Sequence, residues 1–189
     1  MSANSHILFI EIKKDELIFI AAKKKEKDNN YKLIYNNSEP LLNKENNKFI
    51  DYNLIEELIK KKIIWIEQKF DLLFKEVILI IDYFEKNLIN FSGFKILNGS
   101  QLTKENLTYI INSLKSKINE FEVDKKIIHI FNSNFFLDKK KLENLPIGLF
   151  GDFYSHELSF ILMSLNDFKN LENIFSKCNL RIKRIISKS

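Results

Sequence analysis

The apolar residues in the first 82 positions fall mostly into short runs rich in isoleucine, each bounded by polar residues. Runs of this length and composition predict buried β-strands. They are Ile7–Ile12, Leu17–Ala22, Tyr31–Tyr35 and Val77–Ile81. The last run is apolar at every position, which is typical of a central strand covered on both faces. The polar stretch 36–48 contains Pro40 and predicts a loop.

A segment with helical periodicity follows that loop. Asp51 stands at the expected N-cap, where its carboxylate can accept hydrogen bonds from the free amides of the first turn. Apolar residues then recur at helical spacing, at Leu54, Ile55, Leu58, Ile59, Ile63 and Ile66. The spacing predicts a helix over residues 51–69. Trp65 lies among these isoleucines and is predicted to be a core residue.

A second set of elements follows in residues 83–163. Three regions predict strands, the second being either a strand pair or one bent strand. They are Leu88–Leu97, interrupted near Gly93; 126–131 with 135–138; and His156–Met163. Thr103 is expected to cap a helix between the first two regions. Its apolar stripe is Leu107, Ile110, Ile111, Leu114 and Ile118.

The remaining residues predict one helix and one closing strand. Asn166 or Asp167 is expected to cap the helix. Its apolar stripe is Phe168, Leu171, Phe175 and Cys178. Residues 180–186 predict the closing strand. Strands and helices thus mix along the chain in a pattern typical of an α/β (mixed) fold.

The composition fits one folded domain or two small ones. Of the 189 residues, 45% are hydrophobic, which is enough for a packed core. The longest apolar run, Leu17–Ala22, is far shorter than the roughly 20 residues that cross a bilayer. The N-terminus lacks a basic segment followed by an apolar one, so no secretory signal is predicted. The single Cys178 excludes an internal disulfide and fits a reducing cytosol.

The formal net charge of +5 comes almost entirely from lysine. Arg181 and Arg184 are the only arginines in the sequence. Recognition of phosphates and bases relies strongly on arginine forks. The charge is therefore interpreted as a solvated lysine surface, and no nucleic-acid partner is predicted.

Few residues suggest catalysis or metal binding. The three histidines are far apart and no pair has metal-ligand spacing; they are His6, His129 and His156. Cys178 is interpreted as a small core residue. Asp82 and Glu85 follow a central strand, where α/β enzymes often place catalytic groups, but no second group accompanies them. The sequence therefore predicts no catalytic residue, no metal site and no enzyme activity.

Residues 145–151, LPIGLFG, hold one of the two prolines and two of the four glycines. Pro146 fixes its own φ and keeps the preceding residue out of the helical region. Gly148 and Gly151 can adopt φ values that other residues avoid. The stretch is interpreted as a structural turn that lets the chain reverse after Asp138 and continue as another strand.

A longer motif surrounds this turn. Residues 129–151 read HIFNSNFFLDKKKLENLPIGLFG. They resemble a sequence motif of the bacterial cell-division protein FtsA, a relative of actin-like ATPases. The positions in step, without a gap, are His129, Phe135, Leu137, Asp138, Pro146, Gly148 and Gly151. Two family positions differ, since Asn132 replaces a proline and Leu145 replaces an asparagine.

The resemblance continues on both sides of this motif. QLTKENLTYII, from Gln101, is similar to the acidic helix start of the family, with Thr103, Glu105 and Asn106 in place. NLENIFSKCNLRIKRII resembles its helix-then-strand segment, with Cys178 retained and Asn179 in place of a glycine. Asparagine is the next-best residue after glycine at such a left-handed helix end.

The resemblance implies an actin-like, RNase H-like subdomain 1A, present in part, with an inserted subdomain 1C. Residues 1–82 and 164–189 would form subdomain 1A. Residues 83–163 would form subdomain 1C, which has the strand-helix-strand-strand order called SHS2.

The resemblance also implies a role in cell division. FtsA polymerises with the help of 1C, tethers the FtsZ ring to the inner membrane and recruits later division proteins. FtsZ, later division proteins and further copies of this chain are therefore the expected partners. The expected location is the cytoplasm, at the inner face of the membrane where the cell divides.

The chain departs from the family at its phosphate loop. Actin-like ATPases place a glycine and a hydroxyl residue there, so that backbone amides approach phosphate. The corresponding positions here are Glu11, Ile12, Lys13 and Lys14. The second half of the family fold, with its adenosine pocket and amphipathic membrane helix, also has no counterpart in these residues. We therefore expect a non-catalytic protein without a bound cofactor or a direct membrane anchor.

Two alternatives remain open at this point. The chain also fits the related actin-like scaffold of type IV pilus assembly, which would bind a short peptide from a membrane pilus protein between 1A and 1C. It also fits the N-terminal half of an active actin-like ATPase. ATP is the cofactor in the family, and a degenerate loop of Glu11, Lys13 and Lys14 would be its binding site here.

Overall fold

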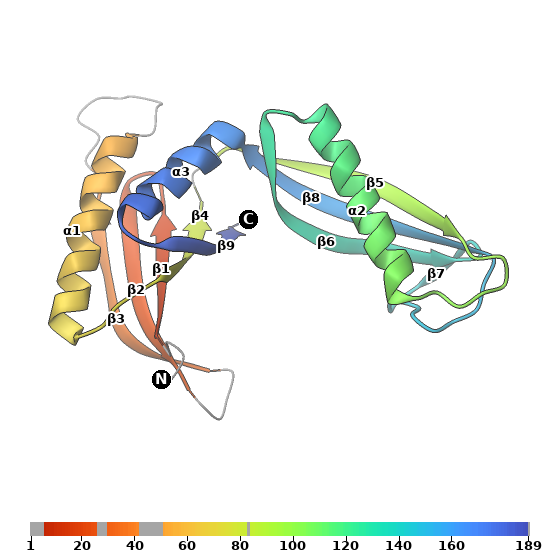
Figure 1. Ribbon diagram of the computed structural model, residues 1–189, viewed down its shortest axis with the longest axis horizontal. Coiled ribbons are helices and arrows are strands. Elements are labelled where there is room, and N and C mark those ends of the chain that lie inside the picture. The colour runs from red at the N-terminus through yellow and green to blue at the C-terminus, as the bar shows by residue number, and fades with distance from the viewer. Residues whose placement is uncertain (1–5, 26–29, 42–50, 83, 189) are drawn as a thin grey trace. The chain divides into compact units, whose positions relative to one another are not determined.

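The computed structural model describes residues 6–25, 30–41, 51–82 and 84–188. The chain divides into two compact units, which are coloured along the sequence in Figure 1. Unit 1 consists of Met1–Phe84 and Asn166–Ser189, and unit 2 consists of Glu85–Leu165. Unit 2 is therefore inserted between two segments of unit 1.

Unit 1 contains a five-stranded mixed sheet, ordered β3-β2-β1-β4-β9. Its strands are β1 (His6–Ile12), β2 (Glu16–Lys24), β3 (Tyr31–Pro40), β4 (Glu76–Ile81) and β9 (Arg181–Ser187). The first three strands pair antiparallel, whereas β1, β4 and β9 pair parallel. The sequence N-terminal to unit 2 thus forms four strands, and the sequence after it adds the fifth.

Two helices cover one face of this sheet. They are α1 (Tyr52–Phe70) and α3 (Leu165–Lys177). Helix α1 lies in the connection from β3 to β4, and α3 lies in the connection from β4 to β9. Both connections join parallel strands and run in the same direction across the sheet. Because such crossovers are right-handed, both helices lie on the same face. The two helices contact each other, since Tyr52 Oη donates to Asp167 at 2.6 Å and Lys177 Nζ lies 2.8 Å from Glu56 Oε2.

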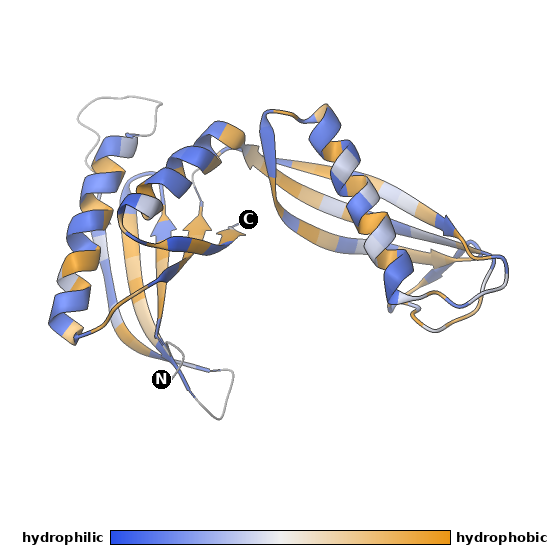
Figure 2. Cartoon of the chain, viewed as in Figure 1, coloured by the Kyte–Doolittle hydropathy of each residue, from blue (hydrophilic) through white to orange (hydrophobic). Residues whose placement is uncertain are grey.

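The core of unit 1 lies between these helices and the sheet. The apolar stripe of α1 buries Ile55, Ile59, Ile63 and Ile66. Alternate strand residues that face it are also buried, including Leu8, Ile10, Phe19 and Leu79. Full burial of such a side chain stabilises the fold by roughly 1.5–3 kcal/mol. Strands β1, β2 and β4 are accordingly largely orange in Figure 2, and the outer sides of the helices are largely blue.

Two of the three predicted N-caps are confirmed, those of α1 and α2. The Asp51 carboxylate accepts from the backbone amides of Asn53 and Leu54, at 3.1 and 3.0 Å. In unit 2, Thr103 and Asn106 form a reciprocal capping box at the start of α2. These caps fix where the two longest helices begin.

Unit 2 contains a four-stranded antiparallel sheet, ordered β5-β8-β6-β7. Its elements are β5 (Lys86–Ile96), α2 (Lys104–Phe121), β6 (Lys125–Leu137), β7 (Lys140–Leu142) and β8 (Phe153–Ser164). Helix α2 packs on one face of the sheet, where it buries Leu107, Ile110, Leu114 and Ile118. Alternate residues of β8 complete this core, among them Tyr154, Leu158 and Phe160. Two sheets and three helices confirm the mixed α/β fold class.

The structure corrects the predicted strand interruption at Gly93. β5 runs continuously through it and pairs with β8 along its whole length. A Cβ at this position would lie 2.5 Å from Cγ2 of Ile110 on α2. The glycine therefore permits close helix–sheet packing and does not break the strand.

Three other strand predictions change. Residues 36–40 were expected in a loop but belong to β3, which ends at Pro40; residues 42–48 of that loop lie outside the described residues. Of the two alternatives for 126–138, the single bent strand is correct, because β6 is continuous over these residues. Its pairing with β8 shifts register at Ile127/His129 and Asn132/Asn134. The short β7 was not predicted.

Three core and cap predictions are wrong. Trp65 is exposed, because the buried stripe of α1 runs through Ile59, Ile63 and Ile66 and leaves position 65 on the outside. Helix α3 begins at Leu165, directly after β8, so neither Asn166 nor Asp167 precedes it as a cap. Cys178 lies just beyond α3 and is half-buried.

Candidate functional site

The predicted phosphate loop is the tight turn between β1 and β2. The backbone N–H of Lys13 donates to the carbonyl oxygen of Glu16 at 3.0 Å, which closes a two-residue hairpin loop. Phosphate loops bind their anion through free backbone amides. Here the amide of Lys13 is already used by the hairpin, and the loop tip consists of Lys14 and Asp15, both exposed.

The side chains of this turn are paired with one another. Lys13 Nζ lies 2.6 Å from Glu16 Oε1. That hydrogen bond raises the pKa of Lys13 and lowers the pKa of Glu16. The buried Glu11 carboxylate accepts from Lys188 Nζ at 2.8 Å, which links β1 to the residue after β9. Among the three predicted binding residues, Lys14 is thus the exposed cation at the tip.

The histidines do not form a site. His156 is buried in unit 2, where its Nε2 lies 3.1 Å from Oδ1 of Asn132 and its ring packs on Phe135. Burial lowers the pKa of His156, so the ring is neutral near pH 7. His129 is half-buried beside Phe131, and His6 lies at the start of β1 in unit 1.

The other candidate residues are also separate. Burial raises the pKa of the Cys178 thiol, which keeps it protonated near neutral pH. Asp82 and Glu85 are exposed. No group of three His, Cys, Asp or Glu residues that could hold a metal ion occurs within the described ranges. These side chains support no catalytic constellation.

The LPIGLFG stretch closes one end of unit 2. Gly148 has φ of 86°, in the left-handed region that favours glycine, and its N–H donates to Leu102 O at 2.8 Å. The N–H of Leu102 donates back to Leu149 O at 2.9 Å. A Cβ on Gly151 would lie 2.6 Å from Leu137 Cδ1. The stretch is therefore more than a connection, since it is bonded to the segment that leads into α2.

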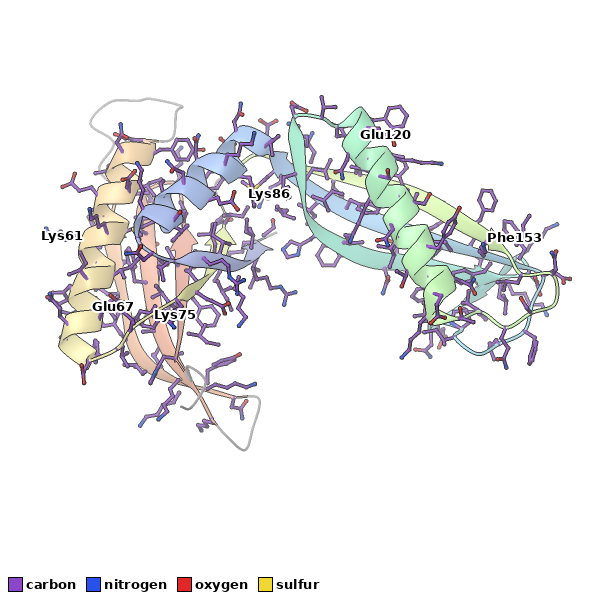
Figure 3. All side chains as sticks on the ribbon, in the orientation of Figure 1. Lys61, Glu67, Lys75, Lys86, Glu120 and Phe153 are labelled. Carbon is purple, nitrogen blue, oxygen red and sulfur yellow. The ribbon has the colours of Figure 1, made fainter. Side chains whose placement is uncertain are left out.

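This end of unit 2 carries a group of exposed apolar side chains, which we call the apolar end. Its members are Phe94, Ile96, Ile147, Leu149, Phe150 and Phe153. The rings of Phe94 and Phe153 stack with centroids 5.6 Å apart. Phe150 is 68% exposed and Phe94 is 61% exposed. In Figure 3, Phe153 lies at the opposite end of the unit 2 sheet from Lys86.

The sequence analysis missed the apolar end, although β5 carries a signal for it. Its apolar residues occur at both alternating sets of positions, with Ile89 and Phe91 on one face and Leu88, Phe94 and Ile96 on the other. Only the first set faces α2. A strand with apolar residues on an uncovered face indicates a second contact surface.

A second exposed aromatic group lies on α1 and β3. The rings of Trp65 and Tyr35 are tilted relative to each other, with centroids 5.4 Å apart, and Lys69 Nζ lies 4.4 Å from the centre of the Trp65 ring. Lys62 lies over both rings and also pairs with Glu39. Cation–π contacts at exposed sites contribute roughly 0.5–1 kcal/mol each, so this group stabilises the helix–strand contact.

Among the comparisons with known proteins, the one with solved structures gives matches. No protein-family model and no curated protein matches the chain. Solved structures do match, among them the PilM-PilN type IV pilus biogenesis complex, with a TM-score of 0.56 and 9% sequence identity. The match covers 96% of this chain and 47% of that chain, so this chain spans about half its length.

The likeness shows that the chain has part of an actin-like fold, as the sequence resemblance predicted. An identity of 9% carries the fold alone. In the described part of the chain, each helix is too short or too polar to span a bilayer.

Proposed function

We propose that this chain is a non-catalytic scaffold with an actin-like fold, which acts by protein–protein contact in the assembly of a membrane-associated machine. The observation that carries the proposal is the apolar end of unit 2. Its six side chains come from β5, from β8 and from the loop between β7 and β8. Exposed apolar groups rimmed by polar residues are typical of interaction surfaces.

The arrangement of the phosphate-loop residues supports the non-catalytic part of the proposal. Lys13 is neutralised by Glu16, and Glu11 is engaged by Lys188. Both partners would have to be displaced before these groups could hold a nucleotide phosphate or its metal. If these pairs stay intact, Lys14 and rearranged backbone amides would have to bind the phosphates of ATP without help from Lys13 or Glu11.

Cell division is the first candidate for the machine. The FtsA-like motif over 129–151 supports it, because its residues form β6, the turn and the loop of the apolar end. In this role the chain contacts FtsZ and later division proteins at the inner face of the membrane. In this role its partners hold it at the membrane.

Type IV pilus assembly is the second candidate. The structural likeness to a PilM-PilN complex favours it. In that role the chain binds a membrane pilus protein. The two candidates share the scaffold mechanism and differ in the partner.

Affinity purification of the tagged chain from its source organism tests the proposal. We expect recovery of FtsZ with later division proteins, or of pilus assembly proteins for the second candidate. Phe150→Ser removes an exposed ring from the apolar end and is expected to reduce recovery at least tenfold. Ile64→Ser, on the exposed side of α1, is the matched control and should leave recovery unchanged. Recovery of neither set, or equal loss in both variants, would contradict the proposal.

A nucleotide titration tests the third reading, an active ATPase half. Isothermal titration of the full chain with ATP and Mg²⁺ should give no saturable heat. Submicromolar binding that Lys13→Ala abolishes would overturn the non-catalytic assignment, because it would mean that the Lys13–Glu16 pair opens for phosphate.

A further inference from the structure

The two sheets have four edges, and three of them carry features that prevent pairing with another strand. Native proteins protect edges with short strands, charges, proline or bulges. β7 has three residues, of which two are lysines. β9 has Arg181, Lys183 and Arg184 among its seven residues. β3 ends at Pro40, and its pairing with β2 shifts register at Ala21/Ala22.

The fourth edge, β5, has no proline or bulge, and its two charges, Lys86 and Lys95, lie near its ends. It is 11 residues long and pairs with β8 without a register shift. Residues 87–94 contain no charge and no proline. Within the described part of the chain no strand pairs with its other side. Leu88 is 65% exposed, and Phe94 is nearly as exposed, on the face away from α2.

We propose that β5 pairs antiparallel with β5 of a second copy of this chain, about a two-fold axis through Phe91. The proposal rests on the proposed function as a protein-contact scaffold and names a further partner and surface for it. A two-fold axis perpendicular to the sheet keeps the α2 face of both copies on one side. The two four-stranded sheets then form one continuous sheet of eight strands.

The residues of β5 are self-complementary in this register. On the outer face, Leu88 lies opposite Phe94 of the second copy, and Asn90 lies opposite Ser92. On the α2 face, Ile89 lies opposite Gly93, and Phe91 lies opposite itself. Apolar residues therefore meet apolar ones and polar residues meet polar ones, at roughly 0.2–1 kcal/mol per favourable pair.

The charges of β5 are compatible with this register. Lys95 lies opposite Asn87 of the second copy and Lys86 lies opposite Ile96, so no like charges meet. This favours a second copy over an unrelated strand, since each position already has a suitable partner in the same sequence. The outer edges of the eight-stranded sheet would both be β7, which is short and basic. Assembly would therefore stop at a closed dimer.

Sedimentation equilibrium of the full chain over a concentration series tests this proposal. We expect a concentration-dependent mass that reaches twice 22.5 kDa. Leu88→Lys with Phe94→Lys places like charges opposite each other twice and should weaken dimerisation at least tenfold. Both side chains are exposed, so circular dichroism and the thermal transition should be unchanged. Leu33→Lys with Phe121→Lys, at residues 58% and 78% exposed elsewhere in the chain, should dimerise like the wild type.

A charge-reversal rescue tests the register itself. The variant Leu88→Glu with Phe94→Glu should also be monomeric alone, and mixing it with the lysine variant should restore a dimer. A wild-type chain that stays at 22.5 kDa would overturn the proposal, as would a dimer that the β5 lysines leave intact or a mixture that stays monomeric. A monomeric chain that still recovers its partner machine contradicts this dimer only. A dimer that recovers no such machine contradicts the proposed function only.

Discussion

The sheets of unit 1 and unit 2 each have helices on one face, but their other faces differ in chemistry. The outer face of the unit 1 sheet carries half-buried isoleucines, among them Ile18, Ile20, Ile78 and Ile80. The outer face of the unit 2 sheet carries a polar row at its middle. There Ser159 Oγ donates to Asn90 Oδ1 at 2.7 Å and lies 2.6 Å from Ser133 Oγ.

The difference follows from strand direction. Sheets of parallel strands are usually covered on both faces, whereas antiparallel sheets often have one face in water. β1, β4 and β9 form the parallel part of the unit 1 sheet, and β4 is apolar on both faces. The unit 2 sheet is antiparallel throughout, and its outer face combines a polar middle with an apolar end. The apolar end thus differs from the polar middle of the same face, and this makes it interpretable as a contact site.

The largest expected effects concern the helix-covered faces, where the two units are alike. Leu79→Ala in unit 1 removes a fully buried side chain and should lower the free energy of unfolding by about 2–5 kcal/mol. Phe160→Ala in unit 2 should lower it by about 3–5 kcal/mol. Urea denaturation of the full chain measures both. A loss below about 1 kcal/mol at either site would mean that the corresponding core is not packed as described.

Substitutions on the outer faces of the two sheets should lower the free energy of unfolding by different amounts in the two units. Ile20→Ser removes a half-buried apolar side chain from unit 1 and should lower the free energy of unfolding by about 1–2 kcal/mol. Ser159→Ala in unit 2 removes two exposed hydrogen bonds and should lower it by about 0.5 kcal/mol. The same urea titration measures both variants. Equal losses would remove the distinction between an apolar and a polar outer face.

Helix caps should be equally important in both units. Asp51→Ala and Thr103→Ala each leave free amides at a helix start, and each should lower the free energy of unfolding by about 1 kcal/mol. Lys117→Ala, on the exposed side of α2, is the control and should change it by less than about 0.5 kcal/mol. No loss for Thr103→Ala would contradict the capping box at α2.

Between pH 7.5 and 5.5, a pH dependence should arise in unit 2, from His156. Burial lowers the folded-state pKa of His156 below its unfolded value near 6.5. The unfolded chain therefore binds more protons as pH falls through that value, and stability decreases on the acid side. Denaturation at pH 7.5 and 5.5 measures the change. His156→Gln should reduce the loss; an unchanged loss in that variant would contradict this source of the pH dependence.

Local patterns predicted most of the elements and the caps of α1 and α2, because these depend on neighbouring residues. The helix after Asp51 and the strand Val77–Ile81 were predicted from spacing alone. The exposed position of Trp65 follows from the same helical phase, since Ile59, Ile63 and Ile66 define the buried stripe. The prediction of a strand interruption at Gly93 was wrong because the glycine is required by the close approach of Ile110, which lies on another element.

The candidate surfaces depend on which strands become neighbours, and local patterns do not determine that. β5 is an edge because it pairs with β8, more than 50 residues away in sequence. The apolar end combines residues of β5 with the loop after β7, which meet through tertiary hydrogen bonds such as those of Leu97 with Asp152 and of Leu102 with Gly148 and Leu149. The turn itself could be predicted from Pro146 and Gly148, but its role in closing unit 2 could not.

Site-specific photo-crosslinking in living cells of the source organism tests the central claim most directly. A photoreactive phenylalanine analogue replaces Phe150 in the apolar end of unit 2, or Ile64 on the exposed side of α1 in unit 1. The account predicts a discrete cross-link to a division or pilus assembly protein from position 150 and none from position 64. The same products from both positions, or no product from position 150, would contradict the assignment of unit 2 as the contact surface.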